Sequence, residues 1–531
     1  CLKSNISSSI RWASPSTKNP RSNPVIQDPH LHHPIRIALL MRAFILYTLL
    51  SFLLVPQAVA QKRQVQLIQA DQMSFDKARS EVRVVTGKVI FEHDSALLYC
   101  DSALFNEVSN HVEAYGNVHI RVNDSLSIYG RELLYEGSTR IADMRGDVRL
   151  IDNRTTLLTP SIRFNRNTSI CSYTEGGRIT DRRNELTSLR GSYYTPDKQF
   201  YFRDSVRLHN PRYDMVSDTL HYNTQSEVAE FFGHTIITSK ENTIVCNEGW
   251  YDTGEDLASF SKRASIRMED RVLWGDSLFY DRVTAYGEAY RNIRMVDAAR
   301  DMEVQGHVAL YHEAAGYAIV TDSALAILAG EDDSLFLHGD TLWAVFDTTG
   351  ETQELYCYHH AKFFRPDLQG MADSLAYLMA DSAIFLHGRP AIWSEAHQLT
   401  GDTIRIDLAN DAIHQVHLLP PAFIASMEDT NAYNQLKGTR MTGFFRDNEM
   451  VRMEIYGNAE TIYYVREEDG RLSGINKAVS SDITIRLEDR KIVEILYINQ
   501  PEAVLYPPSQ FPAQDRFLEG FEWRSHRRPR Q

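Results

Sequence analysis

The sequence has few cysteines, an excess of acidic over basic residues, and no long apolar run after residue 60. Five cysteines among 531 residues do not make a disulfide scaffold, and no pair has the CxxC spacing of a zinc or redox site. With 70 Asp and Glu against 56 Lys and Arg, nucleic acid is not an expected partner, because phosphate binding depends on basic side chains. The later apolar runs are all shorter than a membrane-spanning helix requires.

Residue patterns for catalysis, metals and cofactors are also missing. The pairs His359–His360 and His312–Glu313 lack the i, i+4 partner of a zinc-binding helix, and no glycine-rich phosphate loop is present. The acidic residues form no distinctive pair, so a glycosidase dyad has no support. We therefore predict no metal, no cofactor and no enzymatic activity.

One segment does resemble a catalytic motif. GDSLFYD (275–281) matches the block of the GDSL hydrolases, with Ser277 in the place of the nucleophile. The same slot reads SDTL at 217–220, GDTL at 339–342 and ADSL at 372–375. A nucleophile is a single residue with its own base, whereas Asp followed by Ser or Thr recurs in turns. We interpret the segment as a structural corner.

The first 60 residues differ from the rest. Residues 1–40 are rich in Ser, Pro, Asn and His, and we interpret them as a disordered upstream segment outside the true gene product, which then starts at Met41. Residues 41–60 combine Arg42, the apolar run FILYTLLSFLLV and the motif AVA, which together predict a secretory signal peptide. Removal of residues 1–60 leaves 50 basic and 69 acidic residues, a net charge of −19.

A short phrase recurs along the remaining chain. It reads VTGKVIF at 85–91, AYGNVHI at 114–120 and DMRGDVRL at 143–150, and each glycine turn is followed by alternating apolar and polar residues. Alternation with period two predicts half-buried strands. The first apolar position recurs at intervals of 27 to 31 residues, at Val89, Val118, Val148, Ile179, Val206, Ile236 and Ile266.

A second phrase has the same period. It ends on an aromatic residue at Phe105, Tyr135, Phe164, Tyr194, Tyr222 and Tyr280. Two phrases in one period of about 30 residues predict an all-β array of stacked antiparallel strands. We expect a first module at 61–300, a second and more divergent module at 301–500, and a Pro-rich, basic tail at 501–531. The tail motif WRSHRRPR is interpreted as a solvated end, or else as a contact for anionic head groups or an acidic partner.

Each strand of the array leaves one apolar face, so two such walls enclose either a filled core or a slot. The residues alone leave both open. The candidates that line this interior are Val89, Phe91, Val118, Ile120, Val148, Leu150, Val206 and Leu208.

The signal peptide, the phrases GKVIF, GNVHI and GDVRL, and their partner strands resemble the OstA-like family of periplasmic organic-solvent-tolerance and lipopolysaccharide-transport proteins. The match is strongest over 62 to about 300, and the late segment SDITIRLEDRKIVEILYINQP is similar to the extended members of Bacteroidetes-type bacteria. The resemblance implies an elongated open jelly-roll or folded sheet, with a groove that holds the acyl chains of lipopolysaccharide (lipid A).

The resemblance also implies a periplasmic protein without catalytic activity that serves outer-membrane assembly, with outer-membrane association left open. Its partners are then lipopolysaccharide and other transport components, which pair head to tail through edge strands, and a homo-oligomer is a further alternative. Two other functions stay open: an exported scaffold with a filled core that binds proteins, and a polysaccharide-active β-helix enzyme.

Overall fold

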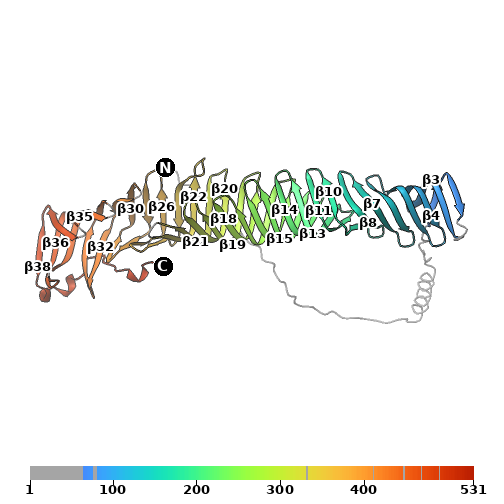
Figure 1. Ribbon diagram of the computed structural model, residues 1–531. Coiled ribbons are helices and arrows are strands. Elements are labelled where there is room, and N and C mark those ends of the chain that lie inside the picture. The colour runs from blue at the N-terminus through green and yellow to red at the C-terminus, as the bar shows by residue number, and fades with distance from the viewer. Residues whose placement is uncertain are drawn as a thin grey trace, which may run out of the picture. The chain divides into compact units, whose positions relative to one another are not determined.

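The computed structural model describes residues 64–75, 81–330, 333–410, 412–446, 449–467, 469–488 and 491–530. The predicted upstream segment and signal peptide lie outside these residues. Residues Arg63–Gln531 form one compact unit, in which the strands follow one another in a long row from β3 to β38 (Figure 1). In the part of the chain that is described, all 38 strands belong to one sheet whose pairings are antiparallel, which confirms the predicted all-β array. None of the described residues forms a helix long and apolar enough to cross a membrane.

The first half of the row consists mainly of strands of 10 to 12 residues. They are β1 (Gln66–Gln69), β2 (Gln72–Phe75), β3 (Val82–His93), β4 (Ala96–Asn106), β5 (His111–Arg121), β6 (Leu126–Glu136), β7 (Ile141–Asp152), β8 (Thr155–Asn165), β9 (Ile170–Tyr173), β10 (Gly177–Asp181), β11 (Asn184–Ser188), β12 (Arg190–Tyr194), β13 (Gln199–Asn210), β14 (Tyr213–Asn223), β15 (Val228–Ser239), β16 (Thr243–Asp252), β17 (Leu257–Arg267), β18 (Arg271–Asp281), β19 (Tyr286–Asp297), β20 (Met302–His312), β21 (Tyr317–Leu328) and β22 (Leu335–Phe346).

The second half has shorter strands, apart from two long ones near its end. They are β23 (Thr352–Tyr358), β24 (Lys362–Arg365), β25 (Leu368–Met371), β26 (Ser374–Leu378), β27 (Ala383–His387), β28 (Ala391–Ser394), β29 (His397–Thr400), β30 (Thr403–Ala409), β31 (Ala412–Leu418), β32 (Ala422–Asp429), β33 (Ala432–Gly438), β34 (Arg440–Arg446), β35 (Glu449–Arg466), β36 (Leu472–Glu488), β37 (Lys491–Ile498) and β38 (Glu502–Tyr506). Three short 3₁₀ helices follow, η1 (Pro508–Gln510), η2 (Ala513–Asp515) and η3 (Ser525–Arg527).

Most long strands bend at a bulge near their middle, and the bulges fold the sheet into two walls. In β5 the register shifts between Tyr115 and Val118, where Gly116 has φ +71° and Asn117 has φ +41°. A positive φ costs glycine little, and a bulge with such a residue increases the local bend. The glycine that the sequence suggested as a turn before a strand is thus a corner inside one continuous strand.

The two walls, wall A and wall B, are defined by their register with the two halves of β3. Wall A contains the half of each strand that pairs in register with 89–93, and wall B contains the half that pairs with 82–86. The hairpin turns of wall A form rim A, which includes turns 94–95, 153–154, 182–183 and 268–270. The turns of wall B form rim B, which includes turns 107–110, 137–140, 195–198 and 253–256.

From β23 onward the corner breaks most strands in two. Wall A continues through β24, β25, β28, β29, β32 and β33, and wall B through β23, β26, β27, β30, β31 and β34. The long strands β35 and β36 again cross both walls. Apolar side chains between the walls form one cluster that runs from Val65 to Ile293 and a second that runs from Ala324 to Ile485.

The C-terminal tail packs back along the outer face of wall A. Gln398 in β29 donates from Nε2 to the carbonyl oxygen of Glu522 at 2.7 Å and accepts from the backbone N–H of Arg524 at 2.7 Å. Gln435 in β33 makes the same pair of hydrogen bonds to Arg516 and Leu518. The interpretation of a solvated end is wrong for Arg524, which is 8% exposed, because these amides bind the tail backbone as a neighbouring strand would.

Candidate functional site

The candidate site is the interior between the two walls. All eight residues named from the sequence lie on wall A and point into this interior, with exposed fractions of 5% or less. Leu150, for example, lies between Ile128 of β6 and Leu157 of β8, which are equally buried. The structure therefore brings the eight residues into one continuous apolar face.

The opposite face, on wall B, was not named from the sequence. Its buried residues include Val85, Phe105, Val112, Leu133 and Met144. The aromatic residues that end the second phrase were the signal in the sequence for this face. In one repeat, however, the buried aromatic residue lies one position earlier than the phrase indicates. Tyr193, rather than Tyr194, is the buried residue of β12.

The two rims meet along a line of polar contacts, which we call the seam. Most of its contacts join residues that are 41 to 46 positions apart in the sequence, a separation that brings a turn of rim A to a turn of rim B. Because the seam lies on the side opposite the corners, it determines whether the interior is closed.

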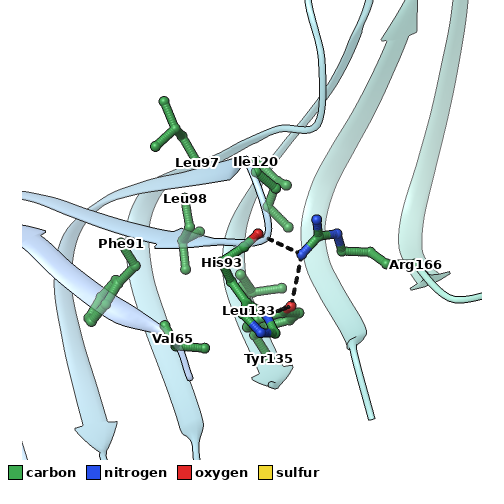
Figure 2. Close-up of a pocket in the computed structure, with 10 residues that line it drawn as sticks. Val65, Phe91, His93, Leu97, Leu98, Ile120, Leu133, Tyr135 and Arg166 are labelled. Atoms are coloured by element: carbon green, nitrogen blue, oxygen red, sulfur yellow. Dashed lines mark hydrogen bonds between the residues drawn. The ribbon is translucent and has the colours of Figure 1, made fainter. Parts of the chain in front are cut away.

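The first seam contact encloses a small apolar cavity (Figure 2). His93 Nδ1 lies 2.5 Å from the hydroxyl of Tyr135, and Arg166 donates to the His93 carbonyl oxygen at 2.9 Å and to the Tyr135 hydroxyl at 3.1 Å. Phe91 and Ile120 line the same cavity, whose volume of about 20 Å³ is enough for one water molecule. An acyl chain does not fit there while the walls stay in contact.

In the next two seam contacts, the buried carboxylates of Asp152 and Asp181 accept hydrogen bonds. The Tyr193 hydroxyl donates to Asp152 Oδ2 at 2.7 Å, and Lys198 Nζ lies 2.6 Å from the same oxygen. One rung further, the Tyr222 hydroxyl donates to Asp181 Oδ2 at 2.9 Å. Burial is the largest cause that raises the pKa of both tyrosines, and the nearby carboxylates add to it. Both phenols therefore stay protonated and act as donors across the seam.

Aromatic side chains fill the interior behind these contacts. Tyr193 stacks on Phe200 with ring centroids 4.1 Å apart, and Phe200 stacks on Phe202 at 5.5 Å. Further along, Arg212 of rim A forms an ion pair with Asp256 of rim B. Although burial alone would raise the pKa of Asp256, hydrogen bonds from Arg212 and Tyr251 hold it below its ordinary value. From β3 to β17 the seam is thus held closed by specific polar pairs.

The segment that resembles a catalytic motif, GDSLFYD (275–281), has a structural role in the fold. Ser277 lies in β18 beside the bulge between Trp274 and Ser277, which is a corner of the folded sheet. The structure groups no three metal-binding side chains together among the described residues. The buried thiols of Cys100 and Cys246 are unpaired, and burial raises the pKa of each to about 12, so they are poor nucleophiles.

Three comparisons relate this chain to known proteins. A search of curated proteins finds no significant match. Among solved structures, the chain is similar to the crystal structure of LptH from Pseudomonas aeruginosa, described as the LptA homologous periplasmic component of the conserved lipopolysaccharide transport device. The identity is 14%, the TM-score is 0.21, and the match covers 26% of this chain and 95% of that one. Residues 62–218 match the family described as OstA-like protein, and this part of the chain is an OstA-like domain.

Proposed function

We propose that this protein is a non-enzymatic periplasmic carrier that binds the acyl chains of lipopolysaccharide between its two walls and helps to transfer them for outer-membrane assembly. The observation that carries the proposal is the unbroken apolar face inside a folded sheet whose first part is an OstA-like domain. On wall A its lining is Val89, Phe91, Val118, Ile120, Val148, Leu150, Val206 and Leu208.

Binding in the first module requires an exchange of contacts. Each CH₂ group of an acyl chain that leaves water contributes about 0.8 kcal/mol. The walls already bury their apolar side chains against each other, so the chain replaces one set of apolar contacts by another. The net gain comes from the lipid, and it is reduced by the polar seam contacts that have to open. Such a balance suits a carrier that must also release its lipid.

The end strands support assembly with partners. At one end, Ile68 of β1 and Phe75 of β2 are exposed, and at the other end Leu496 of β37 and Leu505 of β38 are exposed. Edge strands with exposed apolar side chains are templates for strand addition. We propose head-to-tail pairing with other transport components, or with a second copy of this chain, through these edges.

The proposal includes two modules, 61–300 and 301–500. The interruption of the apolar interior between Ile293 and Ala324 supports a boundary near residue 300. Because neighbouring repeats contact only each other, a boundary in the core lets each half open without the other.

A scaffold that binds proteins is the second candidate, and the close packing around Leu150 favours it. Purification of the protein from a Gram-negative envelope, followed by mass spectrometry of bound lipid, separates the two. The carrier predicts copurified lipopolysaccharide and crosslinking to it from a photoreactive residue at Ile120. Absence of both supports the scaffold. In the envelope, a folded Ile120→Asp variant is expected to impair outer-membrane integrity, whereas an unaffected envelope contradicts the carrier.

A further inference from the structure

Fully buried apolar residues give way to partly buried ones, among them Val304, Ala309 and Val320, where β20 and the adjoining half of β21 cross the interior. The first apolar cluster ends at Ile293 of β19, and the second begins at Ala324 of β21. These strands lie side by side near the middle of the row (Figure 1). Their register continues the inner face without a break, since Ala289 pairs with Ala309 and Ala309 pairs with Val320. The interruption therefore comes from side chains rather than from a change of fold.

Small residues replace large ones at two inner positions of wall B in this segment. Counted from the bulges, Ala289 of β19 stands where the first module has Met144, and Ala309 of β20 stands where it has Leu133. Side chains that extend so little from wall B fill less of the interior than Met144 and Leu133 do.

The inner face of this segment is accessible at both rims, whereas its middle is buried at Ala289, Ile293 and Ala324. Tyr311 points inward at the rim B end of β20, in the place that Tyr135 has in β6, yet it is 43% exposed, whereas Tyr135 is 6% exposed. At the opposite rim, Leu328 of β21 is 39% exposed although its register also places it on the inner face. Both rim ends of the inner face are thus open to solvent in this segment.

The seam ends at the start of this segment, where Arg282 in the rim B turn after β18 forms an ion pair with Glu241 of rim A at 3.5 Å. Among the described residues of β19 to β22 and the turns between them, no hydrogen bond or ion pair joins rim A to rim B. The ion pairs there stay within one rim, where Asp297 Oδ2 lies 2.8 Å from Arg271 Nε and 3.0 Å from Arg300 Nη1. This contrasts with Asp152 and Asp181, whose hydrogen bonds cross the seam.

The chemistry of this face limits what it can hold. The backbones of β19 to β21 pair in ladders on both sides, so the inner face offers no row of free N–H and C=O groups to a peptide strand. Five strands at a spacing of ~4.8 Å span ~19 Å of apolar surface along the row. A hydrocarbon chain needs no hydrogen-bond partner and matches a long, narrow apolar surface.

We propose that the inner face from β18 to β22 is a lateral opening at which an acyl chain of lipopolysaccharide enters the interior, whereas the first module stays closed until its seam opens. This inference rests on the proposed carrier function, and it places the first contact outside the OstA-like domain of residues 62–218. The lipid then moves along the inner face toward Leu208 and Leu150 as the seam contacts of β17 to β3 separate.

Photocrosslinking of the full chain tests the opening. A small aliphatic diazirine residue replaces Val320 at the opening, Leu150 in the closed module, or Ile319 as the outward neighbour of Val320, and each protein is irradiated with purified lipid A. We expect at least tenfold more lipid A crosslinked from Val320 than from either other position. Equal or greater crosslinking from Leu150 overturns the opening but leaves the carrier intact. Equal yields from Val320 and Ile319 overturn the opening, and no crosslink from any position overturns both.

A filling variant gives an independent readout. Ala309→Phe adds a ring next to Val320 without a change of charge, and we expect it to reduce the crosslink from Val320 at least tenfold with an unchanged far-UV circular dichroism spectrum. Leu310→Phe, one residue away on the outer face, is the matched control and is expected to leave the yield unchanged. Lipid labelling that survives in a folded Ala309→Phe variant contradicts the opening.

Discussion

The closed packing of the first module predicts a large local cost for the Leu150→Ala substitution. Leu150 is fully buried between Ile128 and Leu157, so its truncation removes apolar contacts on both sides and leaves a cavity. Leucine-to-alanine changes at such sites cost about 3 to 5 kcal/mol. Leu158→Ala on the next strand is the matched control, because Leu158 is 45% exposed on the outer face, and it is expected to cost less than about 0.5 kcal/mol.

Amide hydrogen exchange with mass spectrometry is the suitable assay, because a repeat array opens locally rather than in one two-state step. We expect Leu150→Ala to lower the opening free energy of β6 to β8 by about 3 to 5 kcal/mol while β27 to β34 keep their protection. Val320→Ala, at a partly buried position, is expected to lower the opening free energy of β21 by only about 1 kcal/mol. A cost below about 1 kcal/mol for Leu150→Ala, with the fold intact, would refute the closed interior.

Three further predictions concern the seam, rim A and the tail. Asp152→Ala leaves the Tyr193 hydroxyl without its buried acceptor. It is expected to lower the opening free energy of β7 to β12, measured by hydrogen exchange, by about 2 to 4 kcal/mol. The control Asp214→Ala removes an exposed carboxylate and is expected to lower the opening free energy by about 0.5 kcal/mol or less. Burial alone would raise the pKa of Asp297, but hydrogen bonds from Arg300 and Arg271 hold it below its ordinary value of 3.8. The stability that these ion pairs contribute is therefore complete above pH 3.8 and is lost as the pH falls below that value. The melting temperature of Asp297→Asn should therefore lie below that of the wild type at pH 6 and approach it as the pH falls below 3.8, and a difference that persists in acid contradicts the ion pairs. Gln398→Leu removes both hydrogen bonds to the tail backbone and is expected to make the tail more than tenfold more sensitive to trypsin, with unchanged cleavage disproving the docking.

The array and one of its walls follow from the sequence because strand alternation is local. The phrase around Val118 and Ile120 has a polar residue between two apolar ones, and both apolar side chains point inward as expected. The role of Gly116 was harder to predict, since a bulge and a hairpin turn both favour glycine with positive φ. Only the register across the neighbouring strands shows that the strand continues through the corner.

The seam and the tail depend on long-range contacts that no local pattern contains. Asp152 and Tyr193 are 41 residues apart, and so are Asp181 and Tyr222. A recurring acid and tyrosine at this separation would have been the available signal once two strands per repeat were assumed. The tail was interpreted as solvated because of its charge. Arg524 is nevertheless buried, and its backbone N–H donates a hydrogen bond to the side chain of Gln398, a contact that composition does not reveal.

The central claim is that acyl chains bind between the two walls. Native mass spectrometry of the full chain, purified from a Gram-negative envelope in mild conditions, tests this claim most directly. A carrier is expected to retain bound lipopolysaccharide in the wild type, and the bound amount is expected to fall at least tenfold in Ala309→Phe. A wild-type protein that is folded, carries no lipid and takes up none from added lipid A would contradict it.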